Sequence, residues 1–272
     1  MTPADFAFVT KLLFDRSAIA LEVGKEYLVE SRLTPVARRH GLNSASDFIH
    51  RLRSLGDNRL VDEMVEAMVT TETSFFRDVH PFETLRKTVL PELIAARRGE
   101  KRLNIWCAAS SSGQEPYTLA LILKEYFPEL LNWHLLFRAT DISQEMLRRC
   151  RQGRFSQLEV NRGLPASLLV KYFRQDAGNW QIRDDVRAMI DFQPLNLATP
   201  WPTMPVFDLI CLRNVMIYFE VETKKAILKR IARQLQPDGY LLLGGAETTF
   251  NLDDSYQRVE TLKSGFYRLV QK

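Results

Sequence analysis

The stretch Ile105–Thr118 constrains the fold of this chain more than any other. An apolar run ends at Ala108 and leads directly into a loop of small residues, after which Glu115 and Pro116 open a helix-prone segment. This order predicts a strand that turns through a tight loop into a helix, and small residues there let the backbone approach a ligand at the carboxyl ends of parallel strands. The loop matches neither G-x-G-x-x-G nor G-x-x-x-x-G-K-S/T, so pyrophosphate and triphosphate ligands are disfavoured.

After about residue 86, strand-like runs alternate with helical ones. The helical runs lie near residues 115–127, 143–151 and 221–235, and the strand-like runs are Leu103–Ala108, His134–Thr140, Met189–Phe192, Phe207–Leu212, Tyr240–Leu243 and, as an antiparallel edge strand, Phe266–Val270. This alternation predicts an α/β fold with a mostly parallel, doubly wound, Rossmann-like sheet. The segment Gly163–Arg187 interrupts it, and the strand-like Trp180–Arg183 predicts a small inserted β subdomain near residues 163–190.

The first 70 residues show helical patterns only. Helical runs cover residues 5–14, 25–40 and 57–69, and Ser44–Asp47 matches a capping box for a further helix through Arg53. We therefore predict an all-helical N-terminal domain over residues 1–70, a linker over 71–85 and the α/β domain over 86–272.

Composition restricts the setting in which such a chain works. Of its 272 residues, 46% are hydrophobic and 26% charged, which is ordinary for a soluble globular protein. No apolar stretch reaches the roughly eighteen residues of a membrane span, and Met1–Phe6 lacks the basic start of a signal peptide. Three cysteines without a C-x-x-C pair indicate a reducing cytoplasm and no structural metal. We expect a cytoplasmic protein.

Two acids stand where ligands bind in such a sheet. Asp141 follows the second apolar run, where an acid accepts both hydroxyls of a ribose; alternatively it caps the helix that begins near Ser143. Glu115 lies in a first helical turn, where an acid either complements the helix dipole or holds an ammonium group. A small-residue loop beside an acid suits a ligand that carries an amino group rather than phosphates, and S-adenosylmethionine is such a ligand.

Further polar residues follow the apolar runs or join the two parts of the chain. The junction Thr70–Arg77 combines a polar run with two aromatics and an arginine, and it is either a ligand-site segment or a linker with a buried Phe pair. Arg213 and Asn214 follow the run Phe207–Leu212, at the edge where open sheets carry their chemistry. Asn196 is either a contact for an adenine edge or an ordinary turn asparagine.

Arginines concentrate in the N-terminal helical part. They form either a solvated helix face or a docking surface for an acidic protein partner. Nucleic acid is disfavoured, because aromatic residues do not alternate with these charges. The arginines concerned are Arg32, Arg38, Arg39, Arg51 and Arg53.

Together these blocks resemble the CheR family of chemotaxis-receptor glutamate O-methyltransferases. The combination of F-F-R, G-Q-E-P-Y and R-N-V-M-I-Y-F is more specific than any single motif, and the similarity spans nearly the whole chain. The matching blocks are Thr70–Arg77, Trp106–Tyr117, Ala139–Ile142, Asn196–Leu197 and Cys211–Phe219. The resemblance implies a class I methyltransferase sheet, S-adenosyl-L-methionine as cofactor and S-adenosyl-L-homocysteine as product.

The resemblance also implies roles for individual residues. Glu115 would hold the methionine end of the cofactor and Asp141 its ribose. Further cofactor contacts would come from Thr71, Thr73, Arg77, Ala108, Asn196, Leu197, Arg213 and Asn214. The residues that would act in catalysis are Arg77, Arg213 and Tyr218. Alternatively, Tyr218 is an ordinary core tyrosine whose hydroxyl has a hydrogen-bond partner. Thr71 stands where some relatives carry Asn, and Gln114 where Glu is frequent.

The implied partner is the cytoplasmic helical domain of chemoreceptors, docked through the basic helices of a monomeric enzyme without membrane insertion. Some family members grip a receptor C-terminal pentapeptide through a glycine-rich insertion, but Tyr172–Trp180 is short and has one glycine, which predicts no such tether. Two other functions stay open. The first is a methyltransferase for small molecules or RNA, although the lack of an N-P-P-Y tetrad disfavours methylation of base amino groups. The second is a non-catalytic adaptor that binds the cofactor.

Overall fold

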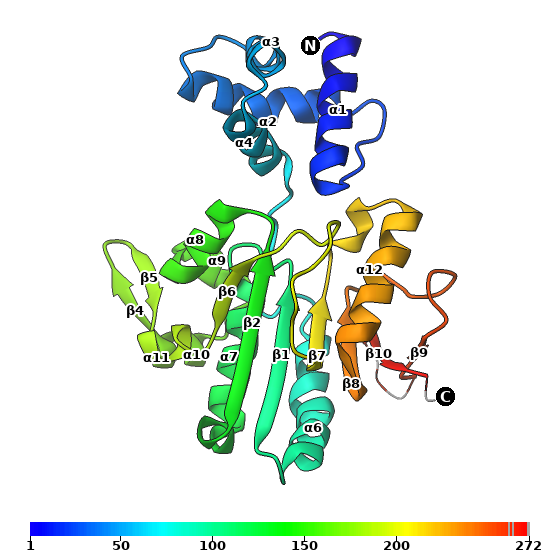
Figure 1. Ribbon diagram of the computed structural model, residues 1–272. Coiled ribbons are helices and arrows are strands. Elements are labelled where there is room, and N and C mark those ends of the chain that lie inside the picture. The colour runs from blue at the N-terminus through cyan, green and yellow to red at the C-terminus, as the bar shows by residue number, and fades with distance from the viewer. Residues whose placement is uncertain (261, 263, 271–272) are drawn as a thin grey trace. The chain divides into compact units, whose positions relative to one another are not determined.

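The computed structural model describes residues 1–260, 262 and 264–270 (Figure 1). The chain divides into two compact units. The helical unit comprises residues 1–70 together with 218–223, and the sheet unit comprises residues 71–217 and the chain from 224 onward.

The helical unit contains the four helices that the periodicity predicts. Thr2 and Ser44 cap two of them, each with its side chain accepting from the backbone N–H three residues on, and with Asp5 and Asp47 closing the capping boxes. The helices are α1 (Pro3–Ser17), α2 (Glu26–Arg39), α3 (Ala45–Leu55) and α4 (Asn58–Met68). Their apolar faces meet in a core that includes Val9, Leu13, Val29, Leu33, Phe48, Ile49, Leu52 and Met64.

A short segment from far along the sequence completes the helical unit. The carbonyl of Tyr218 accepts a hydrogen bond of 3.0 Å from the backbone of Ala20, and Phe219 forms an antiparallel bridge with Ile19. Phe219 is buried. The motif that contains Arg213 and Tyr218 therefore has its beginning in the sheet unit and its end in the helical unit.

The sheet unit is built around seven strands in the order β6-β2-β1-β7-β8-β10-β9. The first five strands run parallel, while β10 is antiparallel to both β8 and β9. The strands are β1 (Arg102–Ala108), β2 (His134–Asp141), β6 (Asp191–Pro194), β7 (Phe207–Leu212), β8 (Leu235–Leu243), β9 (Tyr256–Arg258) and β10 (Phe266–Leu269). The doubly wound, mostly parallel sheet is confirmed.

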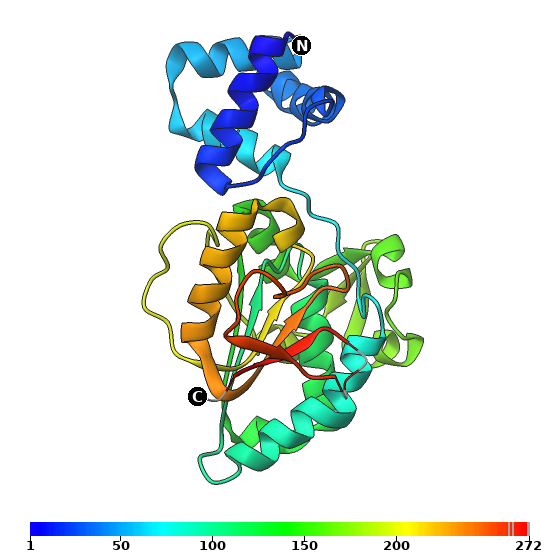
Figure 2. The same ribbon diagram turned by 90° about the vertical axis from the view of Figure 1, so that its right-hand side faces the viewer.

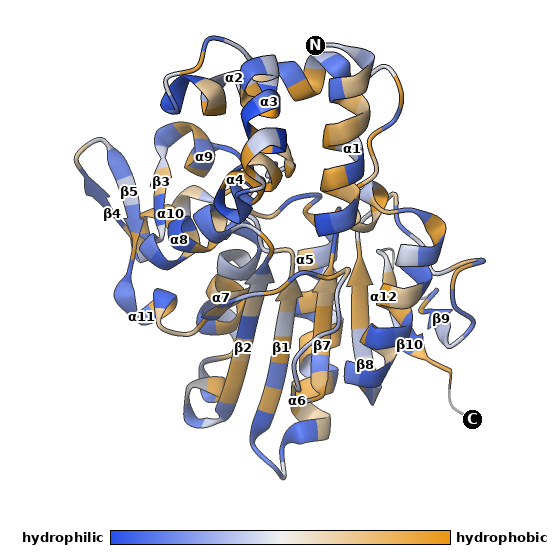
Figure 3. Cartoon of the chain, turned by 45° about the horizontal axis from the view of Figure 1, so that its top comes forward, coloured by the Kyte–Doolittle hydropathy of each residue, from blue (hydrophilic) through white to orange (hydrophobic). Residues whose placement is uncertain are grey.

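Alternation along β1 divides the apolar packing between the two faces of the sheet. Ile105 and Cys107 join the core with α6 (Leu90–Arg97) and α7 (Gln114–Tyr126), whereas Trp106 packs edge-on against Trp201, 5.2 Å between ring centroids, on the opposite face. Figure 2 shows α12 (Val221–Gln234) and α6 on opposite sides of the strands. The central strands are largely apolar (Figure 3), as expected for strands buried on both faces.

The remaining elements connect the strands and carry a small second sheet. The helices are α5 (His80–Thr84), the π-helix η1 (Leu85–Val89), the 3₁₀ helices η2 (Pro128–Asn132) and η3 (Met216–Tyr218), α8 (Gln144–Gln152), α9 (Gln157–Asn161), α10 (Ala166–Tyr172) and α11 (Asp184–Arg187). The small sheet has the antiparallel order β3-β5-β4, with β3 at Arg154–Ser156, β4 at Phe173–Asp176 and β5 at Asn179–Ile182.

Three predicted boundaries are wrong in detail. The small sheet begins at Arg154, so the predicted range 163–190 left out its first strand. The strand predicted at Met189–Phe192 is Asp191–Pro194, and the one predicted at Tyr240–Leu243 already begins at Leu235. Among the described residues, no helix combines the length and the apolar character needed to cross a bilayer.

Candidate active site

The loop after β1 is bent tightly by three residues in the left-handed region. Ala109 has φ 60°, Ser111 has φ 49° and Gly113 has φ 99°. A Cβ on Gly113 would lie 3.1 Å from the Sγ of Cys150 and 3.2 Å from the ring of Tyr117, so this position favours glycine for both its φ and its space. The loop therefore turns tightly after β1 and carries only small side chains from Ala109 to Gly113.

Asp141 fixes this loop from the neighbouring strand. It ends β2, and its carboxylate accepts hydrogen bonds from the backbone N–H of Ser111 at 2.7 Å and of Ser143 at 2.9 Å. Ser143, not Asp141, is the N-cap of α8, and its hydroxyl accepts from Met146 N–H. The alternative of Asp141 as the helix cap is therefore wrong, and the carboxylate lies against the small-residue loop instead.

Glu115 forms a buried ion pair with Arg213. The Nη1 of Arg213 lies 2.6 Å from Glu115 Oε2, and its Nη2 lies 2.8 Å from Asp78 Oδ2 and 3.2 Å from the carbonyl of Arg77. The side chain of Arg213 is only 1% exposed. Burial works against its charge, but Glu115 and the other neighbouring acids outweigh burial and raise the pKa of Arg213.

The ion pair joins three segments that are distant in sequence. Arg213 follows β7, Glu115 lies in the first turn of α7, and Asp78 lies in the junction before α5. The guanidinium also stands over the ring of Phe82, 5.3 Å from its centroid. Contact of Arg213 with an external substrate, as the resemblance implied, has no support in this burial; the arginine instead fixes Glu115.

The junction 71–79 reaches the same edge of the sheet. The carbonyl of Thr71 accepts from the hydroxyl of Ser111 at 2.7 Å, and Thr73 and Arg77 are half-buried. Arg77 donates to the carbonyl of Glu72 at 3.2 Å. Phe76, Asp78 and Val79 all have positive φ values, and this is unusual for a β-branched residue such as Val79. The junction is thus a shaped segment of the sheet unit rather than an extended linker.

Asn196 and Leu197 follow β6, next to the end of β2. The backbone N–H of Leu195 donates to the carbonyl of Asp141 at 2.9 Å, which holds this turn beside Asp141. Asn196 Oδ1 accepts from Ala198 N–H at 2.9 Å, and the side chain of Leu197 is buried. The Asx turn of Asn196 matches the ordinary alternative for this residue, and it leaves the predicted adenine contact a prediction.

The structure brings most of the predicted site residues to one edge, with one exception. Ala108, Glu115, Asp141, Arg213 and Asn214 all lie at or just after the carboxyl ends of strands or at the start of α7. The exception is Tyr218, which belongs to the helical unit. Its predicted catalytic role therefore stays a prediction.

Glu247 is a residue that the sequence prediction missed. Its carboxylate accepts four backbone N–H groups, from Asn214, Val215, Met216 and Gly244. A buried acid just after the last parallel strand is the sequence signal that could have identified it, because this is the edge at which such sheets place functional loops.

The three cysteines are all buried. Cys107 and Cys211 face each other across β1 and β7, and one ligand atom from each of Cys107, Cys211 and Glu115 lies within 4.8 Å of the others. Burial, and then the neighbouring Cys211, raise the pKa of Cys107 well above its usual value, and Glu115 is already engaged by Arg213. A thiol held in its protonated form, next to a carboxylate that already has a partner, makes a poor metal ligand.

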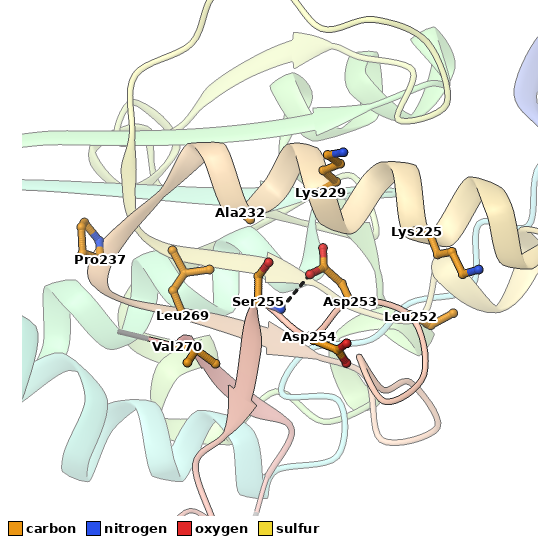
Figure 4. Close-up of a pocket in the computed structure, with 10 residues that line it drawn as sticks. All are labelled: Lys225, Lys229, Ala232, Pro237, Leu252, Asp253, Asp254, Ser255, Leu269 and Val270. Atoms are coloured by element: carbon orange, nitrogen blue, oxygen red, sulfur yellow. Dashed lines mark hydrogen bonds between the residues drawn. The ribbon is translucent and has the colours of Figure 1, made fainter. Parts of the chain in front are cut away.

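A cavity of about 870 Å³ lies elsewhere in the sheet unit, between α12 and the turn before β9. Figure 4 shows Asp253 accepting from the backbone of Ser255 at its rim, with Lys229 on the facing helix. The ten described residues that line the cavity include none of the predicted site residues. The cavity is therefore separate from the carboxyl edge described above.

The donor set at the carboxyl edge fits S-adenosylmethionine. A carboxylate at the end of β2 suits ribose hydroxyls, and a second carboxylate at the start of α7 suits an amino group. The loop between them, Ala109–Gly113, is made of small residues, three of them serines. These features define an S-adenosylmethionine-dependent methyltransferase of class I.

Comparison with known proteins places the chain more closely. Residues 71–264 match the model of the CheR methyltransferase SAM-binding domain, and residues 4–69 match that of the CheR methyltransferase all-alpha domain. The chain belongs to the CheR methyltransferase family. It is 40% identical over 271 residues to chemotaxis protein methyltransferase 1 of Pseudomonas aeruginosa, covering 97% of each chain. It is 37% identical over 260 residues to chemotaxis protein methyltransferase Cher2 of Pseudomonas putida, covering 94% of each.

Proposed function

We propose that this chain transfers the methyl group of S-adenosylmethionine to the side-chain carboxylates of specific glutamates in the cytoplasmic helical domain of chemoreceptors. The products are glutamyl methyl esters and S-adenosylhomocysteine, and the role is sensory adaptation. The observation that carries the proposal is the pair of carboxylates, Asp141 and Glu115, on either side of the small-residue loop, in a chain whose relatives are named chemotaxis protein methyltransferases.

In this proposal the cofactor is held by residues of the sheet unit. Asp141 binds the ribose hydroxyls and Glu115 the amino group, since ionised carboxylates accept hydrogen bonds only. Arg77 borders the reacting methyl group. The other contacts come from Thr71, Thr73, Ala108, Asn196, Leu197 and Asn214, which all lie in the segments that reach the carboxyl edge.

The chemistry needs positioning more than proton transfer. The bound cofactor supplies a methyl group on a sulfonium, and a glutamate acceptor is already ionised at pH 7, so no general base is required. The protein's task is to align the acceptor and to exclude water. Arg77, half-buried beside Glu72, orients the acceptor carboxylate, and Arg213 acts as a positioning residue through Glu115. The role of Tyr218 as a donor to one acceptor oxygen is proposed from the family resemblance alone.

The test is transfer of radiolabelled methyl from S-adenosylmethionine to receptor-containing membranes, followed by mild base. Release of label as methanol is expected for glutamyl esters. Cofactor binding without transfer would favour the adaptor function instead. Asp141→Asn should weaken cofactor binding by at least about tenfold in calorimetry, which corresponds to about 1.4 kcal/mol, and normal turnover by Tyr218→Phe would refute the role of Tyr218.

Docking through the basic helices is proposed for only part of the predicted set. Arg32 donates to the carbonyl of Met68 and to Thr70, and Arg53 donates to the carbonyl of Ala4 and stands over the ring of Phe8. These two arginines serve the helical unit itself. The remaining candidates, Arg38, Arg39 and Arg51, are exposed.

Charge reversal tests this docking. Arg38→Glu with Arg51→Glu should raise the KM for receptor membranes, more so at low salt, because exposed charges steer association. The affinity for S-adenosylmethionine should not change. Arg98→Glu, an exposed arginine of the sheet unit, is the matched control. An unchanged KM in the double variant would refute docking by these residues.

We also propose that the enzyme works as a monomer without the receptor pentapeptide tether. β4 and β5 are joined by a two-residue turn, Ala177–Gly178, in which both residues have positive φ, and such a turn leaves no extended glycine-rich loop. Light scattering should give the mass of one chain. Binding of a receptor C-terminal pentapeptide with micromolar affinity in calorimetry would contradict tether independence.

A further inference from the structure

Glu247 makes an unusual set of contacts for an acidic residue. Its Oε2 accepts from the backbone N–H of Asn214 at 2.7 Å and of Gly244 at 2.8 Å, and its Oε1 accepts from Val215 at 2.9 Å and Met216 at 2.8 Å. Glu247 is 8% exposed. A carboxylate offers about four acceptor sites, so these four donors use its whole capacity.

These contacts tie the turn after β7 to the turn after β8. Asn214 has φ 57°, a left-handed conformation that asparagine adopts more readily than most residues with a Cβ. At the other turn, a Cβ on Gly244 would lie 2.7 Å from Glu247 Oε2 and 2.9 Å from the Asn214 nitrogen. The two turns therefore approach each other closely, with the carboxylate between them.

The charge of Glu247 is balanced by backbone dipoles. Within the described part of the chain, no lysine or arginine forms an ion pair with it, in contrast to Glu115 at the same edge. Glutamine at this position would present its NH₂ group to N–H donors in place of an acceptor oxygen. A neutral isostere therefore cannot keep the same turn, even though its volume is the same.

We propose that Glu247 is a positioning residue for methyl transfer. By fixing the 214–216 turn, it sets the direction of the Asn214 side chain and the point from which Arg213 reaches Glu115. This inference rests on the proposed methyl transfer, in which these residues face the reacting groups. Small displacements of such groups reduce turnover strongly, because the reaction depends on in-line geometry.

The test compares Glu247→Gln with a matched buried carboxylate at the other end of the sheet. Asp208 is 2% exposed and accepts from Asn104 N–H and from Arg97 Nε, both at 2.7 Å, at the start of β7. Asp208→Asn should lower stability and leave kcat unchanged. Glu247→Gln should lower kcat for receptor methylation by about 10- to 100-fold, with little change in the KM for receptor or in cofactor affinity.

A second variant keeps the test decisive if Glu247→Gln fails to fold. Glu247→Asp keeps the charge but shortens the reach, so it should fold and still lose about tenfold in kcat. Tryptophan fluorescence would verify that each variant is folded at the assay temperature. Wild-type kcat in folded Glu247→Gln or in Glu247→Asp would overturn the positioning role alone, whereas failure of the unsubstituted chain to methylate receptors would overturn the proposed function and this inference with it.

Discussion

The ion pair between Arg213 and Glu115 gives the most quantitative prediction. Arg213→Met keeps an unbranched side chain but removes the cation, and it leaves Glu115 without its partner at 2.6 Å in a largely buried place. Removing one partner of a buried pair costs about 3–5 kcal/mol. Glu115→Gln leaves Arg213 paired with Asp78 at 2.8 Å, so we expect a smaller loss of about 1–3 kcal/mol.

The double variant tests the coupling between the two side chains. If the pair interacts as its geometry indicates, Arg213→Met with Glu115→Gln should be more stable than the sum of the single changes predicts, by about 1–3 kcal/mol. The assay is urea unfolding followed by tryptophan fluorescence, with linear extrapolation to water. All four tryptophans, Trp106, Trp133, Trp180 and Trp201, lie after residue 70, so the signal reports on the sheet unit.

The same variants separate a structural role from a cofactor role. Glu115→Gln should weaken binding of S-adenosylmethionine even without urea, where the variant is fully folded. The reason is that the residue proposed to contact the ammonium group loses its negative charge. Additive free energies of unfolding, within about 0.5 kcal/mol, would refute the coupling. Unchanged cofactor affinity in Glu115→Gln would refute its proposed contact.

Three further predictions concern the loops and buried groups of the sheet unit. Gly113→Ala should lower the free energy of unfolding by roughly 1–3 kcal/mol, whereas Gly99→Ala, whose new Cβ meets no atom within 4 Å, should be near neutral in the same urea assay. Burial opposes ionisation of Glu159, but hydrogen bonds from Ser156 and Arg149 outweigh burial and lower the pKa of Glu159. The stability that this ionised carboxylate contributes is present above the unfolded carboxyl pKa and should be lost as pH falls below about 4.5. Glu159→Gln should lose less stability over this pH range, and an equal loss in both proteins would contradict the prediction. Burial raises the pKa of Cys150 to about 12, so the native chain should resist thiol reagents at pH 8 and react only after denaturation; rapid native labelling would contradict this.

The central strands could be predicted because their sequence signal is local. β1, β2 and β7 are continuous apolar runs that end in polar or small residues, and the structure begins and ends them within one residue of the prediction. The predicted strand Tyr240–Leu243 misses the start of β8, because Gln236–Gly239 in front of it is not apolar. The structure keeps these residues in the strand and absorbs them in a register shift between Phe207 and Leu209 on β7.

The three-residue strands β3 and β9 could not be predicted, since their existence depends on their partners. β3 and β9 have three residues each, too few for an alternating pattern, and they pair with β5 and β10 from later in the chain. The same limit applies to the site. Sequence order indicated Glu115 and Arg213 as separate ligand contacts, but nothing local indicates that two residues 98 positions apart form an ion pair.

The proposed reaction requires the carboxyl edge to accept both a cationic cofactor and an anionic acceptor. Parallel register aligns Ala108 with Thr140 and with Leu212, which brings the following loops together. Each acid there is already engaged: Asp141 by the N–H groups of Ser111 and Ser143, Glu115 by Arg213, and Glu247 by four backbone N–H groups. In the proposed reaction, these dipoles and the buried cation would offset charges that otherwise repel a glutamate, while the carboxylates would still favour a sulfonium. Removing the one side-chain partner among them, the Arg213 cation, should therefore weaken acceptor binding as well as stability.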